Sequence, residues 1–246
     1  MSIKKTESTS LQRSDLKQFT NARVALRTSG VSLCTEELLA FKLAHARAVD
    51  AVWTEWDRTK ISNELKASGI ESLLIESEAG SRMRYVKNPQ SGCRINEPSK
   101  KIIESLKNEN AISIILADGL SPIASQEQGS KLIPYLVEEL RALAMKIHPI
   151  FICSNGRVAI GDSIGEITKS KIAIVIIGER PGLTTPQSLG MYITLNPTAA
   201  STNANRNCIS NIHEEGLSIE QASNECKQLI EKMLKQNISG YQLHAK

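Results

Sequence analysis

The amino-acid sequence predicts an α/β fold with a Rossmann-like, mostly parallel sheet flanked by helices, behind a largely helical N-terminal region. After residue 99, short apolar runs rich in β-branched residues alternate with segments of helical spacing. Before residue 78, the apolar residues recur mainly at helical spacing, and glycines and prolines interrupt residues 78–98. We therefore expect a flexible N-terminal tail over 1–14, a mainly helical region over 15–98 and a Rossmann-like domain over 99–246.

The N-terminal region is expected to be built around one long helix. Thr35 is a good N-cap, and Glu36 and Glu37 follow in the first turn, where the helix dipole favours acidic residues. The apolar residues expected on one face of this helix span about six turns: Leu38, Phe41, Ala48, Val49, Val52 and Trp56. His45 falls on the same stripe, so we expect a core histidine. Residues 63–75 continue in a helical or mixed pattern.

Four apolar runs in the second half are short enough to be strands, and helical patterns separate them. The predicted strands are Ala111–Ala117, Pro149–Cys153, Ile172–Ile177 and Leu189–Leu195. The predicted helices are 100–107, a helix that follows the Ser121-Pro122 start signal and runs to about Lys146 with a break or kink at Pro134, 164–170, and a last helix that begins at a Ser218–Gln221 capping box.

Composition excludes several classes of protein. The chain has 246 residues, of which 41% are hydrophobic and 23% charged, as in globular proteins that bury a sizeable core. Its net charge of +4 is scattered and its aromatic content is 4%, so we expect no nucleic-acid binding. The five cysteines include no CxxC pair, which argues against a disulfide framework and a zinc site. The N-terminus has no apolar signal core, and no run is long enough for a membrane span, so we expect a cytoplasmic protein.

Three predicted strands end in glycine-containing polar segments, which are 118–121, 155–158 and 178–182. In an open α/β sheet, ligands bind outside the carboxyl ends of the strands, so the recurrence favours a pocket there. The alternative is that all three are ordinary βα turns. No GxGxxG, P-loop, GxSxG or HExxH motif occurs, and the four histidines are far apart. We therefore predict no catalytic residue and no metal ligand, and favour a module that holds a large ligand for chemistry performed elsewhere.

Several segments resemble the small subunit of ethanolamine ammonia-lyase over about residues 15–241. The segments that carry the resemblance are FKLAHAR (41–47), DGLS (118–121), GRVAIGD (156–162), IGEI (164–167), IIGERPGL (176–183) and RNCISNI (206–212). The resemblance implies an enzyme that uses adenosylcobalamin (coenzyme B12) and converts ethanolamine to acetaldehyde and ammonia by radical chemistry. It also implies a large TIM-barrel subunit as partner, with the small subunit covering the other side of the cobalamin and both assembling into a hetero-oligomer.

The resemblance further assigns three cofactor contacts within 99–246, namely Val158, Glu179 and Cys208. Val158 offers an apolar contact, and Glu179 accepts hydrogen bonds from amide or ribose donors. Cys208 is small and polarizable, and we expect it in a turn. Arg157 and Arg180 are candidates for the cofactor's phosphate.

Each of these residues also has a simpler interpretation. Val158 is then turn packing, Glu179 pairs with an arginine on a solvated loop, and Cys208 is an inert buried thiol. For the whole chain, the alternatives are a free-standing Rossmann-like enzyme and a binding or structural module without activity of its own. The DxHxxG motif of cobalamin proteins that replace the lower base is missing, so we expect that base to stay on the cobalt. Only 14 residues precede Asp15, fewer than in relatives packaged in bacterial microcompartments, so packaging is doubtful.

Overall fold

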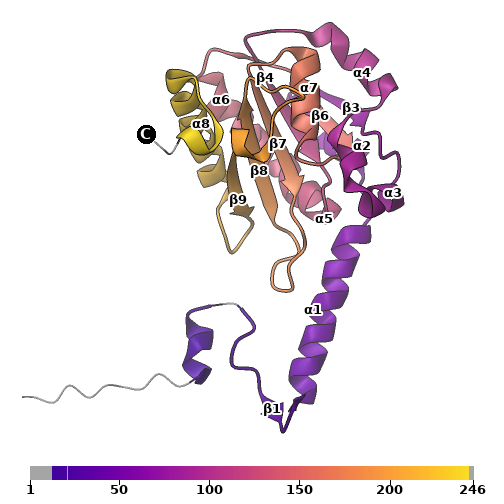
Figure 1. The fold of residues 1–246 in the computed structure, drawn as a ribbon, viewed down its shortest axis with the longest axis vertical. Coiled ribbons are helices and arrows are strands. Elements are labelled where there is room, and N and C mark those ends of the chain that lie inside the picture. The colour runs from indigo at the N-terminus through magenta and orange to yellow at the C-terminus, as the bar shows by residue number, and fades with distance from the viewer. Residues whose placement is uncertain (1–12, 21, 244–246) are drawn as a thin grey trace, which may run out of the picture.

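A computed structural model describes residues 13–20 and 22–243, so the predicted tail lies almost wholly outside the described residues. Its centre is a seven-stranded sheet with the order β3-β6-β4-β7-β8-β9, in which the short β5 pairs with β4 (Figure 1). The strands are β3 (Ser72–Glu76), β4 (Ala111–Ala117), β5 (Lys146–Ile147), β6 (Ile150–Ser154), β7 (Ile172–Gly178), β8 (Leu189–Leu195) and β9 (Arg206–Ile212). All pairings are parallel except those that β8 makes with β7 and β9. The predicted α/β class with a mostly parallel sheet is confirmed.

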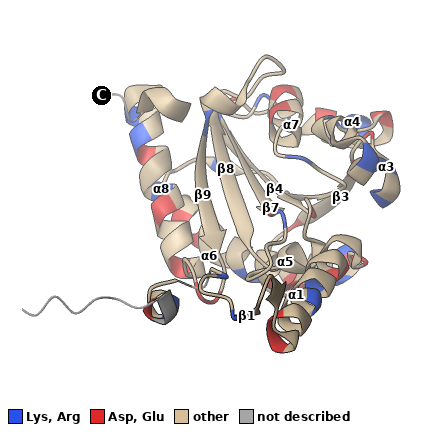
Figure 2. Ribbon diagram, turned by 60° about the horizontal axis from the view of Figure 1, so that its bottom comes forward, with Lys and Arg blue, Asp and Glu red and all other residues tan. Residues whose placement is uncertain are grey.

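Helices cover both faces of this sheet, as Figure 2 shows. On one face, α6 (Ser130–Arg141) and α8 (Ile219–Gln236) enclose the larger core. On the other face, α4 (Glu97–Ile103) and α7 (Ile160–Thr168) enclose a smaller core. Every residue of β4 and β7 is buried, because these central strands have helices on both sides.

The α7 face of the sheet is left open over β8 and β9. Met191 and Ile193 of β8 are buried in the core on the α8 side. Tyr192, between them, points to the other face and is half-buried, and its partner Cys208 on β9 is exposed. Successive strand residues point to opposite faces, so Tyr192 and Cys208 lie side by side on the open part of the α7 face of the sheet.

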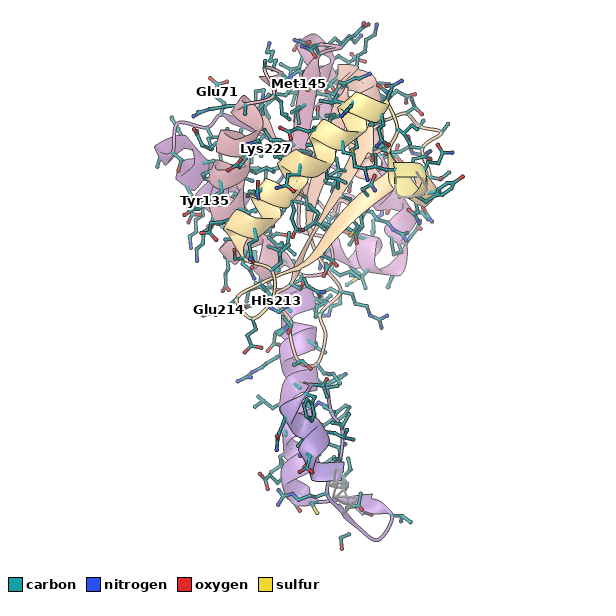
Figure 3. All side chains as sticks on the ribbon, turned by 90° about the vertical axis from the view of Figure 1, so that its left-hand side faces the viewer. Glu71, Tyr135, Met145, His213, Glu214 and Lys227 are labelled. Carbon is teal, nitrogen blue, oxygen red and sulfur yellow. The ribbon has the colours of Figure 1, made fainter. Side chains whose placement is uncertain are left out.

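A long helix, α1 (Thr35–Trp53), extends away from the body (Figures 1 and 3). Only Ala44 and Ala51 are buried on it. Its exposed large apolar side chains are Leu38, Leu39, Phe41, Leu43, Val49 and Trp53. The short hairpin of β1 (Thr28–Ser29) and β2 (Ser32–Leu33) lies at its far end.

The remaining elements are short. They are η1 (Arg13–Gln18), α2 (Arg58–Ala67), α3 (Arg82–Lys87), η2 (Pro89–Cys93), η3 (Glu104–Leu106), α5 (Pro122–Ala124), the π-helix η4 (Ser125–Gly129), η5 (Asn203–Asn205) and η6 (Gly240–Leu243).

The structure corrects several predictions about these elements. Cys34, not Thr35, is the N-cap of α1, and the helix ends at Trp53. His45 is exposed and stacks on Phe41 with ring centroids 6.3 Å apart, so the core assignment was wrong. Pro134 lies inside α6 without ending it. The predicted capping box of α8, formed by Ser218 and Gln221, is confirmed.

Candidate functional site

The carboxyl ends of β4, β6 and β7 meet at one edge of the sheet, and the loops that follow them line a cavity of about 480 Å³. The lining residues are Tyr85, Pro89, Gly119, Leu120, Arg157, Val158, Ile177, Gly178, Glu179, Arg180 and Tyr192. All three glycine-containing segments predicted to form a pocket contribute to it. Its volume is within the range of small-molecule sites.

A buried ion pair holds two of these loops in place. Asp118 accepts a hydrogen bond from the backbone N–H of Gly156 at 3.2 Å and pairs with Nη1 of Arg82 at 3.3 Å. Arg82 also donates from Nη1 to the carbonyl of Gly119 at 2.6 Å and from Nε to that of Val52 at 2.8 Å. Burial raises the pKa of Asp118 to about 6, although Arg82 opposes the shift. The pair therefore joins the β4 loop, the β6 loop and the C-terminal end of α1.

Tyr85 supports the β6 loop from α3. Its hydroxyl donates to the carbonyl of Gly156 at 3.1 Å, and burial raises its pKa. Its ring lies against Gly92, where an added Cβ would approach the ring within 2.6 Å. Arg157 follows Gly156, and its backbone N–H donates to the carbonyl of Gly92 at 2.8 Å. The loop that presents Val158 is thus fixed on two sides.

Glu179 is half-buried and is held by hydrogen bonds rather than by an arginine. Its Oε2 accepts from Oγ of Ser188 at 2.8 Å, and its backbone N–H donates to the Ser188 carbonyl at 2.9 Å. Its Oε1 lies over Gly190, where an added Cβ would be only 2.6 Å away. Among the described residues Glu179 forms no ion pair, so the alternative of pairing with Arg180 is not observed.

Cys208 lies in the middle of β9, so its predicted place in a turn was wrong. The side chain is exposed, which excludes the inert buried thiol. It lies directly opposite Tyr192, its partner on β8, and partial burial raises the pKa values of both groups. Because Tyr192 also lines the cavity, it links Cys208 to Val158 and Glu179. The three predicted residues therefore lie on one continuous surface.

A second buried ion pair, between Asp162 on α7 and Arg206 on β9, lies beside this surface. Burial raises the pKa of Asp162, against the opposing effect of Arg206. Asp162 lies four residues after Val158 and Arg206 two residues before Cys208. The pair thus connects α7, which follows the loop of Val158, to β9, which carries Cys208.

Sequence reasoning missed Tyr85, Gly190 and Tyr192. The alternation along β8 was the available signal, because Tyr192 is flanked by the inward-facing Met191 and Ile193. Within the part of the chain that the structure describes, no group of three or more His, Cys, Asp or Glu side chains is arranged to hold a metal ion. Among the same residues no helix is both long and apolar enough to cross a membrane.

Comparisons with known proteins agree with the resemblance found in the sequence. A model of the family described as ethanolamine ammonia-lyase light chain (EutC) matches residues 11–244. The ethanolamine ammonia-lyase small subunit of Pseudomonas aeruginosa is 39% identical over 235 residues, covering 93% of this chain and 85% of that protein. The small subunit from Pseudomonas fluorescens is 36% identical over 233 residues, with coverages of 93% and 84%. That from Azotobacter vinelandii is 37% identical over 232 residues, with coverages of 93% and 86%. This chain belongs to the ethanolamine ammonia-lyase light chain family.

Proposed function

We propose that this chain is the non-catalytic small subunit of an adenosylcobalamin-dependent ethanolamine ammonia-lyase, which converts ethanolamine to acetaldehyde and ammonia by radical chemistry. In this proposal the surface formed by Val158, Glu179 and Cys208 covers the cobalamin on the side opposite a large TIM-barrel subunit. The observation that carries the proposal is the convergence of these three residues. They come from three separate parts of the chain, yet Val158 and Glu179 line one cavity and Tyr192 joins Cys208 to it.

The chemistry of this surface fits a corrinoid. The rim of a cobalamin carries several carboxamide side chains, and a carboxylate such as Glu179 accepts hydrogen bonds from their N–H groups. Val158, Leu120 and the Tyr192 ring supply apolar area for a flat macrocycle or a base. Gly190 leaves room beside Glu179, because a side chain there would displace the carboxylate.

When bound, adenosylcobalamin supplies the organic radical needed for the deamination. The part left to this chain is to hold the cofactor and to exclude water from one of its sides. The described residues of the cavity include no nucleophile–base pair, which supports a role without chemical steps of its own.

The long helix α1 supports the proposal of a large-subunit partner. It carries six exposed large apolar side chains along its length, more than a monomeric surface helix needs. Its C-terminal end is tied to the cavity through the hydrogen bond between Arg82 and Val52. A partner that shares the cofactor would approach the same side of the molecule.

The test is reconstitution. The purified chain with adenosylcobalamin and ethanolamine should release no acetaldehyde, and it should tend to aggregate because of α1. Adding a large subunit should give a soluble complex with turnover. Substantial turnover by the chain alone would contradict the two-subunit proposal. A stable complex that never binds cobalamin would instead identify a structural module.

A further inference from the structure

Two arginines line the cavity without forming an ion pair among the described residues. Arg157 follows β6 and Arg180 follows β7, and both side chains are exposed. Neither occurs among the ion pairs of the described chain, whereas Arg82 and Arg206 beside them are both paired and largely buried. The cavity thus presents two guanidinium groups to solvent.

The carboxylate of the cavity does not neutralise these arginines. Glu179 is turned toward β8, where Ser188 donates to its Oε2 and its Oε1 lies over Gly190. Arg157 enters from the β6–α7 loop, and in the sheet β6 is separated from β8 by β4 and β7. The carboxylate is therefore held at the β8 side of the cavity, and neither Arg157 nor Arg180 forms an ion pair with it.

An anionic group of a ligand would pair with these two exposed guanidinium groups. Cobalamin carries one fixed anion, the phosphodiester of its nucleotide tail. Guanidinium groups bind phosphate oxygens with paired, charge-assisted hydrogen bonds, and two of them match one phosphodiester better than a single ammonium would. Leu120, Val158 and the Tyr85 ring lie in the same cavity and suit the aromatic base beyond the phosphate.

We propose that Arg157 and Arg180 hold the phosphodiester of the cobalamin nucleotide tail, so that this cavity selects complete cobalamins over corrinoids that lack the tail. This inference rests on the proposed function, because it assigns one part of the proposed cofactor to one side of the proposed site. It adds a specificity role that Glu179 and Cys208 do not carry.

The test compares two corrinoids on the complex reconstituted with a large subunit. Cobalamin carries the nucleotide tail, whereas cobinamide has the same corrin ring and lacks the phosphodiester bridge to the base. The variant Arg157→Gln/Arg180→Gln keeps long polar side chains and removes both charges. The matched control is Arg94→Gln, since Arg94 is exposed, pairs with Glu78 and does not line the cavity. Affinities are measured by spectrophotometric titration, without substrate.

The double variant should bind cobalamin at least about 10-fold more weakly than the unmodified complex, the effect of losing one hydrogen bond to a charged group. Its affinity for cobinamide should stay within about 2-fold, and Arg94→Gln should change neither affinity. An unchanged affinity for cobalamin, or equal losses for both corrinoids, would overturn the inference. An unmodified complex that binds neither corrinoid would overturn the proposed function itself.

Discussion

Ser188 and Glu179 form two hydrogen bonds with each other across the connection between β7 and β8. The Ser188 hydroxyl donates to Oε2 of Glu179 at 2.8 Å, and the Glu179 backbone N–H donates back to the Ser188 carbonyl at 2.9 Å. The carboxylate is therefore oriented before any ligand arrives. Pre-organisation of this kind lowers the entropy lost when a ligand binds.

Replacing Ser188 with alanine should weaken cobalamin binding to the reconstituted complex by about 2- to 10-fold, the range for one ordinary hydrogen bond. The Glu179 carboxylate is still present in this variant, but the Ser188 hydroxyl no longer orients it. Ser163 on α7 lies outside the cavity, so Ser163→Ala serves as the control. Equal cobalamin affinities of the Ser188→Ala and Ser163→Ala complexes would show that the orientation of Glu179 does not contribute to cofactor binding.

Replacing Gly190 with alanine should destabilise the protein by about 1–3 kcal/mol, the usual cost of overpacking. The new Cβ would lie 2.6 Å from Oε1 of Glu179 and 3.0 Å from the Tyr192 ring. Urea unfolding at low protein concentration measures the change. Gly182→Ala is the control, because its Cβ would meet nothing closer than the Thr185 carbonyl at 3.5 Å.

The clash at Gly190 should also depend on Glu179. In a Glu179→Ala background the nearest obstructing atom is gone. Gly190→Ala should therefore lower the free energy of unfolding in urea by less there than in the unmodified chain. If the stability loss of the double variant equalled the sum of the two single losses, the carboxylate would not occupy the position over Gly190.

Part of this architecture was predictable from local sequence. The runs Ala111–Ala117 and Leu189–Leu195 were predicted as strands with the bounds of β4 and β8, because both are short, mostly apolar and bounded by turn residues. Edge strands lack this signal. Only Ile75 is buried in β3, and RNCISNI of β9 is mostly polar, so neither was predicted as a strand.

The candidate site was predictable only through its motifs. The pairing of Tyr192 with Cys208 depends on the register of β8 and β9, which includes an irregularity between Leu189 and Met191. No periodicity in the sequence encodes that register. Arg82 likewise reaches Asp118 from 36 residues away, through the packing of α3 against the β4 loop.

Breaking the buried ion pair of Arg82 and Asp118 should strongly lower the free energy of unfolding. Arg82→Met leaves Asp118 buried without its cation, and losses of about 3–5 kcal/mol are typical for such a change. The double variant Arg82→Met/Asp118→Asn removes both charges and should recover part of the loss in urea unfolding. A double variant less stable than the sum of the single changes would contradict a paired role.

Stability should also depend on pH through His148, which is 2% exposed and lines a cavity together with Glu71 and Met145. Burial, and then Lys146, lowers its pKa to about 4. The folded protein therefore binds a proton less readily than the unfolded chain. The contribution of neutral His148 is fully present above about pH 6.5 and is lost as the pH falls toward 4.

His148→Phe should remove this dependence. The free energy of unfolding of the unmodified chain, minus that of the variant, should fall by about 3 kcal/mol at most between pH 7 and pH 4. The opposite trend expected from Asp118, whose pKa is raised, is common to both proteins and cancels in the difference. A difference that does not change with pH would show that His148 is freely protonated in the folded state.

The most direct test of the account is the affinity of the reconstituted complex for adenosylcobalamin when Glu179 is replaced with alanine. Losing a hydrogen bond to a charged group costs roughly 1.5–3 kcal/mol, so binding should weaken by about 10- to 150-fold. The turnover number at saturating cofactor should fall less. Glu166→Ala, an exposed change on α7 away from the cavity, should leave the affinity unchanged. An affinity as high as that of the unmodified complex, in a Glu179→Ala complex shown to assemble fully, would contradict the proposed cobalamin surface.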